Sequence, residues 1–182
     1  MRIHGAANKN SRKEGTVKQA SPTRGPSPFS RKLVTLIEND AEELARIWLN
    51  DVKKNVKLPS YHTFNEEDLY KRAYEVYRHL GKWISWETSK EEISLQYRAH
   101  GAQRQQQGFE LSEVVQALIL MRRRLWDKVT FEGLLDTVLH MHQALDLNHQ
   151  VVRYFDRAIY YTIIGFMKNL DLAEIIEKST DG

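Results

Sequence analysis

The sequence predicts an all-α fold: a single bundle of about six helices that follows a disordered tail. From Leu33 onward, apolar residues recur with the period of a helix, and only Pro59 interrupts them. No segment alternates apolar and polar residues as a strand would. The 182 residues suffice for one domain with a substantial core.

Residues 1–30 differ from the rest in composition and are predicted to form a disordered basic tail. They contain three of the four prolines and almost no large apolar side chains, so they cannot bury enough surface to offset chain entropy. Residues 1–32 carry eight Lys/Arg against one Glu, a net charge of +7. A solubilising extension explains such a tail; a basic arm for nucleic acid or an anionic surface, or a transit-like peptide, is the alternative. The domain is expected to span residues 31–182.

The clearest sequence signals for helix starts and ends lie in the middle of the chain. Asn65 is a good N-cap residue for a helix that extends to about Trp86. Ser89 and Glu92 form a capping box for the next helix, which Gly108 terminates as its C′ residue. The remaining helices are expected over residues 33–54, 111–129, 131–145 and 148–169, with a short amphipathic segment at 172–176.

Composition and motifs exclude several classes of protein. There is no cysteine, which rules out disulfides and thiolate chemistry. Residues 33–182 carry nineteen Lys/Arg against twenty-three Asp/Glu, so the domain itself lacks the basic balance of a nucleic-acid-binding domain. No GxSxG, Walker, HExxH or kinase motif is present, and we expect no enzymatic activity.

The sequence also predicts a cytoplasmic protein. No signal peptide is visible, because the first thirty residues lack an apolar stretch. The longest apolar run, residues 158–167, is much shorter than the ~20 residues that a membrane span needs.

His100 and Arg104 are the first candidate for a functional site. They lie four residues apart on one side of the helix that Ser89 begins. Together they could bind a small anion or form a pH-sensitive contact. The alternative is the polar face of a surface helix.

A second candidate is an ion pair between two later helices. Arg122, Arg123 and Arg124 spread over about 200° of the helix, so at least one of them must point inward or sideways. Arg122 is the best candidate, and Asp156, within the most apolar helix, is its expected partner. The pair is interpreted as a structural strut or as part of a ligand-responsive core.

The histidines of the following helix allow one cofactor hypothesis. His140 and His142 are two residues apart and point away from each other, so they cannot share a metal ion, and no metal site is expected. His142 is placed on the apolar side of its helix and could be an axial haem ligand. A packed histidine with one hydrogen bond is the alternative.

Aromatic residues on two faces of the last long helix indicate that it is either central or pairs with a second subunit. They are Tyr154, Phe155, Tyr160, Tyr161 and Phe166.

Taken together, these residues resemble the N-terminal sensory domain of RsbT co-antagonist proteins of the RsbR and RsbRD type. The resemblance covers residues 33–167 and rests on Ala45–Trp48, His100–Val115, Leu120–Arg122 and Asp146–Tyr160 with Asp156. It implies a globin-like helical fold that usually lacks haem, forms dimers and passes a stress-response signal to an attached output domain, commonly a STAS domain.

Because the chain ends at Gly182, we expect a stand-alone relative that acts on a separate signalling protein of the STAS, kinase or phosphatase type. The leading hypothesis is a non-enzymatic, homodimeric bacterial signal-sensing module without a cofactor. Its polar residues of interest are His100, Arg104, Arg122 and Asp156. A haem-binding, globin-type gas or redox sensor that uses His142 is the alternative.

Overall fold

The structure is a computed structural model that describes residues 27–85, 88–133 and 135–180, with side chains through Asn169. Over these residues it contains eight helices and no strand, which confirms the predicted all-α fold. The helices are α1 (Pro28–Asn39), α2 (Ala41–Lys54), α3 (Pro59–Thr63), α4 (Glu66–Arg78), α5 (Leu80–Ile84), α6 (Lys90–Gln106), α7 (Leu111–Phe131) and α8 (Val138–Thr180).

The tail predicted over residues 1–30 lies outside the described residues as far as residue 26. Helix α1 starts at Pro28, earlier than the expected start of the domain at residue 31. Ser27 caps it, since the Ser27 hydroxyl accepts a hydrogen bond of 3.0 Å from the Ser30 backbone N–H.

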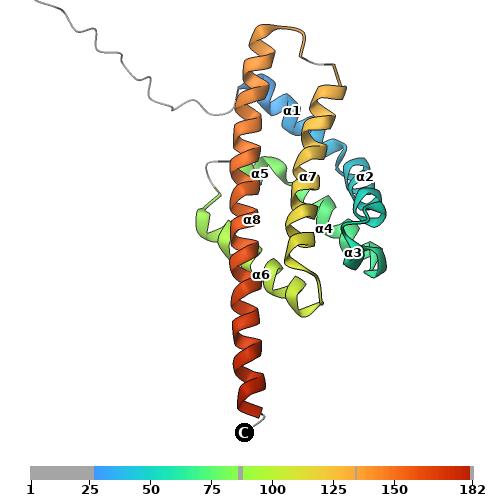
Figure 1. Cartoon of the computed structure of the whole chain (residues 1–182). Coiled ribbons are helices and arrows are strands. Elements are labelled where there is room, and N and C mark those ends of the chain that lie inside the picture. Colours follow the sequence, from blue (N-terminus) through green and yellow to red (C-terminus); the bar gives the residue numbers. More distant parts are fainter. Residues whose placement is uncertain (1–26, 86–87, 134, 181–182) are drawn as a thin grey trace, which may run out of the picture.

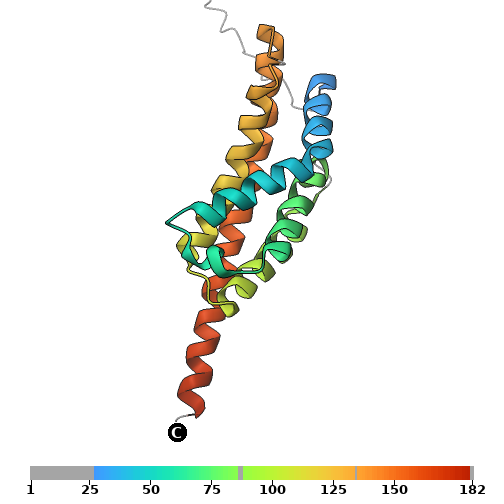
Figure 2. The same ribbon diagram turned by 90° about the vertical axis from the view of Figure 1, so that its right-hand side faces the viewer.

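The helix expected over residues 33–54 is two helices, so this prediction was wrong. The backbone leaves the helical conformation at Asp40, with ψ at 17°, and the chain turns there (Figure 2). The Asp40 carboxylate is held 2.7 Å from Lys128 of α7. The turn lets α1 pack on α8 while α2 packs on α4 and α7.

The predicted helix starts in the middle of the chain are confirmed. The Asn65 side chain accepts a hydrogen bond of 3.0 Å from the Asp68 N–H at the start of α4. The Ser89 hydroxyl accepts one of 3.0 Å from the Glu92 N–H at the start of α6. Helix α4 ends at Arg78, however, and the separate helix α5 follows it as far as Ile84; the expected end at Trp86 lies outside the described residues.

Residues 138–180 form the single long helix α8, whereas the sequence predicted two helices and a short segment over 131–176. No proline or glycine, which would break a helix, lies between Val138 and Ile164. Buried residues continue across the expected break at spacings of three and four: Ala144, Leu147, Val151, Tyr154 and Ala158.

Helix α8 runs the length of the molecule, and α6 and α7 pack against it (Figure 1). Its C-terminal turns extend beyond the other helices in both ribbon views (Figures 1 and 2). No helix in the described part of the chain is long and apolar enough to cross a membrane.

The backbones of α6 and α8 come so close that no side chain fits between them. Each helix has one glycine at this contact. A Cβ atom on Gly101 would lie 2.0 Å from the Thr162 carbonyl oxygen. A Cβ atom on Gly165 would lie 2.1 Å from the Arg98 carbonyl oxygen. Only glycine permits this contact of backbone with backbone.

We expect Gly101→Ala to lower the free energy of unfolding by about 2–3 kcal/mol, because the added methyl group forces α6 and α8 apart. Urea denaturation measures the change. Gly81→Ala is the matched control, since its Cβ would meet movable side-chain atoms, Val34 Cγ1 at 3.0 Å and Glu38 Oε1 at 3.1 Å. Equal stability of the two variants would contradict the tight packing of α6 on α8.

Candidate functional site

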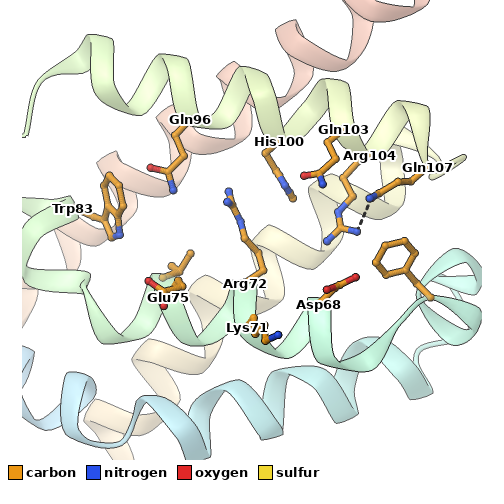
Figure 3. Close-up of a pocket in the computed structure, with 12 residues that line it drawn as sticks. Asp68, Lys71, Arg72, Glu75, Trp83, Gln96, His100, Gln103, Arg104 and Gln107 are labelled. Carbon is orange, nitrogen blue, oxygen red and sulfur yellow. Dashed lines mark hydrogen bonds between the residues drawn. The ribbon is translucent and has the colours of Figure 1, made fainter.

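A pocket of about 450 Å³ lies between α4 and α6, with α5 at one end (Figure 3). Its lining is mostly polar and includes two of the residues singled out in the sequence, His100 and Arg104. The lining residues are Phe64, Asp68, Lys71, Arg72, Glu75, Val76, Trp83, Gln96, His100, Gln103, Arg104 and Gln107.

The C-terminal end of α6 shapes one side of the pocket. Gly108 has the left-handed φ of 78° predicted for a C′ residue. Its N–H donates to the Gln105 carbonyl at 3.0 Å, and the Phe109 N–H donates to the Arg104 carbonyl at 3.1 Å. These two bonds make a Schellman motif, which turns the chain back and brings the Phe109 ring under the Arg104 side chain.

Arg104 is buried, with 5% of its surface exposed. Its guanidinium carbon lies 4.6 Å from the Phe109 ring centroid, 4.9 Å from that of Phe64 and 6.0 Å from that of Tyr61. Its Nη1 donates to Gln107 Oε1 at 3.0 Å, whereas the buried Nε has no acceptor among the described residues. Stacking on rings rather than pairing with a carboxylate therefore accommodates this charge.

His100 lies one helical turn before Arg104 and is also buried. Burial lowers the pKa of His100 well below its usual 6.5, and the nearby charges of Arg72 and Arg104 lower it further. The imidazole is therefore neutral at physiological pH. The structure brings His100 and Arg104 to one pocket; their function stays a prediction.

Arg72 of α4 belongs to the same pocket, and the sequence analysis missed it. Its side chain rises from α4 toward His100 (Figure 3), and its guanidinium carbon lies 5.4 Å from the Tyr97 ring centroid. The buried Nη2 has no acceptor in the described part of the chain. A signal was present: Arg72 follows the buried Leu69 by three residues and precedes the buried Val76 by four, which places it on the core-facing side.

The predicted pair of Arg122 and Asp156 is present, with a separation of 3.1 Å between Nη1 and Oδ1. It lies at the surface, however, because 61% of the Asp156 side chain is exposed. The Arg122 side chain is nevertheless as enclosed as that of Arg124, since 30% and 32% of their surfaces are exposed. Arg124 makes the more enclosed pair, donating through Nε and Nη2 to the two carboxylate oxygens of Asp51 at 2.5 and 2.8 Å.

His140 and His142 take the reverse of their expected positions. His142 is exposed on α8 and does not line the pocket between α4 and α6. His140 instead packs on Phe29, with ring centroids 4.3 Å apart. Haem ligation by His142 stays a prediction from the sequence. The described residues contain no cluster of three potential metal ligands.

The fold and the site define an all-α domain with a polar, arginine-containing pocket between α4 and α6. Residues 42–172 match the family model of the RsbT co-antagonist protein rsbRD N-terminal domain, over more than half of the 182 residues. The chain belongs to this family of regulatory, sensor-type domains, which confirms the resemblance seen in the sequence. A search of the curated proteins and a search of the solved structures found no match. The globin-like arrangement stays a prediction.

The buried, neutral His100 predicts a pH-dependent stability. Its pKa is lower in the folded protein than in the unfolded chain, so its contribution is present above about pH 6.5 and is lost as the pH falls below that value. When the pH falls from about 7.5 to about 5.5, we expect the free energy of unfolding to decrease less in His100→Gln than in the wild type. Urea denaturation at the two pH values measures this difference. His149→Gln, at an exposed position of α8, is the control and should follow the wild type.

The two arginine–carboxylate pairs should differ in strength. Asp51 is 18% exposed and accepts two hydrogen bonds from Arg124, so Asp51→Asn is expected to lower the free energy of unfolding by about 1–2 kcal/mol. Asp156→Asn, which removes the exposed pair, should change it by less than about 0.5 kcal/mol. A thermal or urea unfolding series decides this, and a larger effect of Asp156→Asn would contradict it.

Proposed function

We propose that this chain is a non-enzymatic signal-sensing domain that regulates a separate signalling protein. Its membership of a regulatory domain family supports this role. The observation that carries the proposal is the position of α6 between the pocket and α8. His100 and Arg104 line the pocket, whereas Gly101, between them in sequence, contacts the backbone of α8.

This arrangement gives a physical route from the pocket to the rest of the molecule. No side chain separates α6 from α8 at Gly101 and Gly165, so there is nothing between them that can adjust when α6 moves. A shift of α6 caused by a ligand would therefore be passed to α8. Since α8 extends beyond the bundle, it is suited to report such a shift elsewhere (Figure 1).

We further propose that the domain acts as a homodimer through α8. This helix exposes several large apolar side chains, which a second subunit would cover. They are Val138, Leu139, Met141, Leu145, Tyr160 and Met167.

The partner of this domain is expected to be a STAS-domain protein, a kinase or a phosphatase of a stress-response switch. We predict that the purified chain is a dimer by light scattering and binds one of these proteins from the same genome, with a Kd in the micromolar range or tighter (~1 μM). Biolayer interferometry measures the binding. A monomer that binds none of the three classes would refute the proposal.

Glycine variants test whether the contact of α6 with α8 transmits the signal from the pocket to the partner protein. Gly165→Ala separates the two helices and is expected to change the affinity for the partner about 5- to 100-fold, the range of an ordinary allosteric coupling. Gly81→Ala, which meets only movable side chains, should bind the partner as the wild type does. If both variants bind like the wild type, α6 and α8 do not transmit the signal.

A further inference from the structure

We propose that the pocket between α4 and α6 binds a small organic anion, whose carboxylate or phosphate group is held by Arg72 and Arg104. This inference rests on the proposed sensing function, because it names the chemical class of the signal. It is argued from the charges, the buried donors and the size of the pocket.

The two arginines of the pocket form no ion pair among the described residues, whereas Lys71, the third basic residue of the lining, pairs with Glu67 at 2.7 Å. Arg104 is attracted by the negative charge of Asp68, but the two side chains are not in ion-pair contact. Arg46, Arg122 and Arg124, by contrast, each pair with an acid at 3.6, 3.1 and 2.5 Å. A buried guanidinium without a counter-ion is costly, so an anion at this place would be bound favourably.

The acids of the pocket do not neutralise these two arginines. Glu75 pairs with His79 at 3.2 Å, on the outer side of α4. Asp68 lies near Arg104 at the rim of the pocket but makes no ion pair with it among the described residues (Figure 3). Lys71 of the lining pairs with Glu67 at 2.7 Å, so the positive charge that remains for a ligand is that of Arg72 and Arg104.

Three hydrogen-bond donors of the pocket residues are buried without an acceptor among the residues that the structure describes. They are Arg72 Nη2, Arg104 Nε and Trp83 Nε1. Protein polar groups that are buried almost always find a partner, and the oxygens of a carboxylate or phosphate are the acceptors that arginine prefers. The void behind the two arginines measures only about 10 Å³, which is room for about one water molecule. The larger pocket in front of them is where a ligand would bind.

The remaining lining suits an organic molecule rather than a bare ion. Phe64, Val76 and Trp83 supply apolar surface, and Gln96 and Gln103 supply amide groups that can donate or accept. A pocket volume of about 450 Å³ falls within the range of about 300–1,000 Å³ for small-molecule sites. The anionic group would contact the arginines, and the rest of the ligand would lie along these apolar side chains.

The test titrates the full chain with three probes at constant ionic strength, namely inorganic phosphate, citrate and benzoate, using isothermal calorimetry. We expect at least one probe to bind once per chain. Arg72→Gln is expected to weaken that binding about 10- to 100-fold, the loss typical of a charge-assisted hydrogen bond. Arg78→Gln is the matched control, because Arg78 lies on the same helix, is exposed and does not line the pocket; it should bind like the wild type.

Two further measurements distinguish a loss of binding from a loss of folding in the Arg72→Gln variant. Arg72→Lys keeps the charge and should retain part of the binding. Arg72→Gln should unfold at the same temperature as the wild type or higher when no anion is present, because it removes an uncompensated charge. Absence of binding by all three probes, wild-type binding by Arg72→Gln, or equal weakening by Arg78→Gln would each overturn the proposal.

The outcomes separate this proposal from the proposed function. If a probe binds through Arg72 but does not alter the affinity for the partner protein, the anion site stands and the sensing function fails. If the chain binds its partner but none of the probes, the regulatory function stands and the anion site fails.

Discussion

The contact of α6 with α8 at Gly101 and Gly165 is the constraint on which the site depends. Because no atom larger than hydrogen fits between the two backbones, α8 fixes the distance and rotation of α6. A hydrogen bond between the Tyr97 and Tyr154 hydroxyl groups joins the same two helices near the middle of α6. With one face held in this way, the other face of α6 is presented to α4 at a defined position, and the pocket lies in the space between them.

The end of α6 shows how a local motif and the site use the same residues. Gly108 adopts the left-handed conformation that closes the helix, and this conformation places Phe109 where it both donates to the Arg104 carbonyl and stacks on the Arg104 guanidinium. The charge of Arg104 is thereby kept inside the protein by the aromatic faces of Phe109, Phe64 and Tyr61 instead of a carboxylate. Its hydrogen-bonding capacity toward the pocket remains partly unused.

Local signals in the sequence predicted well what depends on local structure. Ser89, Asn65 and Gly108 act within one helical turn, and all three are seen in their predicted positions. The break at Asp40 and the continuity of α8 were missed because packing against other helices decides them. Arg72 was missed for a related reason: its burial depends on α6, far away in the sequence, although its spacing from Leu69 and Val76 gave a hint.

The ion pairs of the bundle lie where they can stabilise it although Arg72 and Arg104 have no counter-ion in the described part of the chain. Outside the pocket, an ion pair between Arg124 and Asp51 joins α7 to α2. A second ion pair, between Lys128 and Asp40, joins α7 to the junction of α1 and α2. These pairs do not involve α4 or α6, so the stability that they supply does not depend on what the pocket contains. Apolar residues in place of Arg72 and Arg104 would be expected to stabilise the empty domain. The buried Arg104 and the half-buried Arg72, which form no ion pair among the described residues, would thus make α4 and α6 the part of the bundle that gains most from a bound anion, and α6 is the helix whose movement α8 would follow.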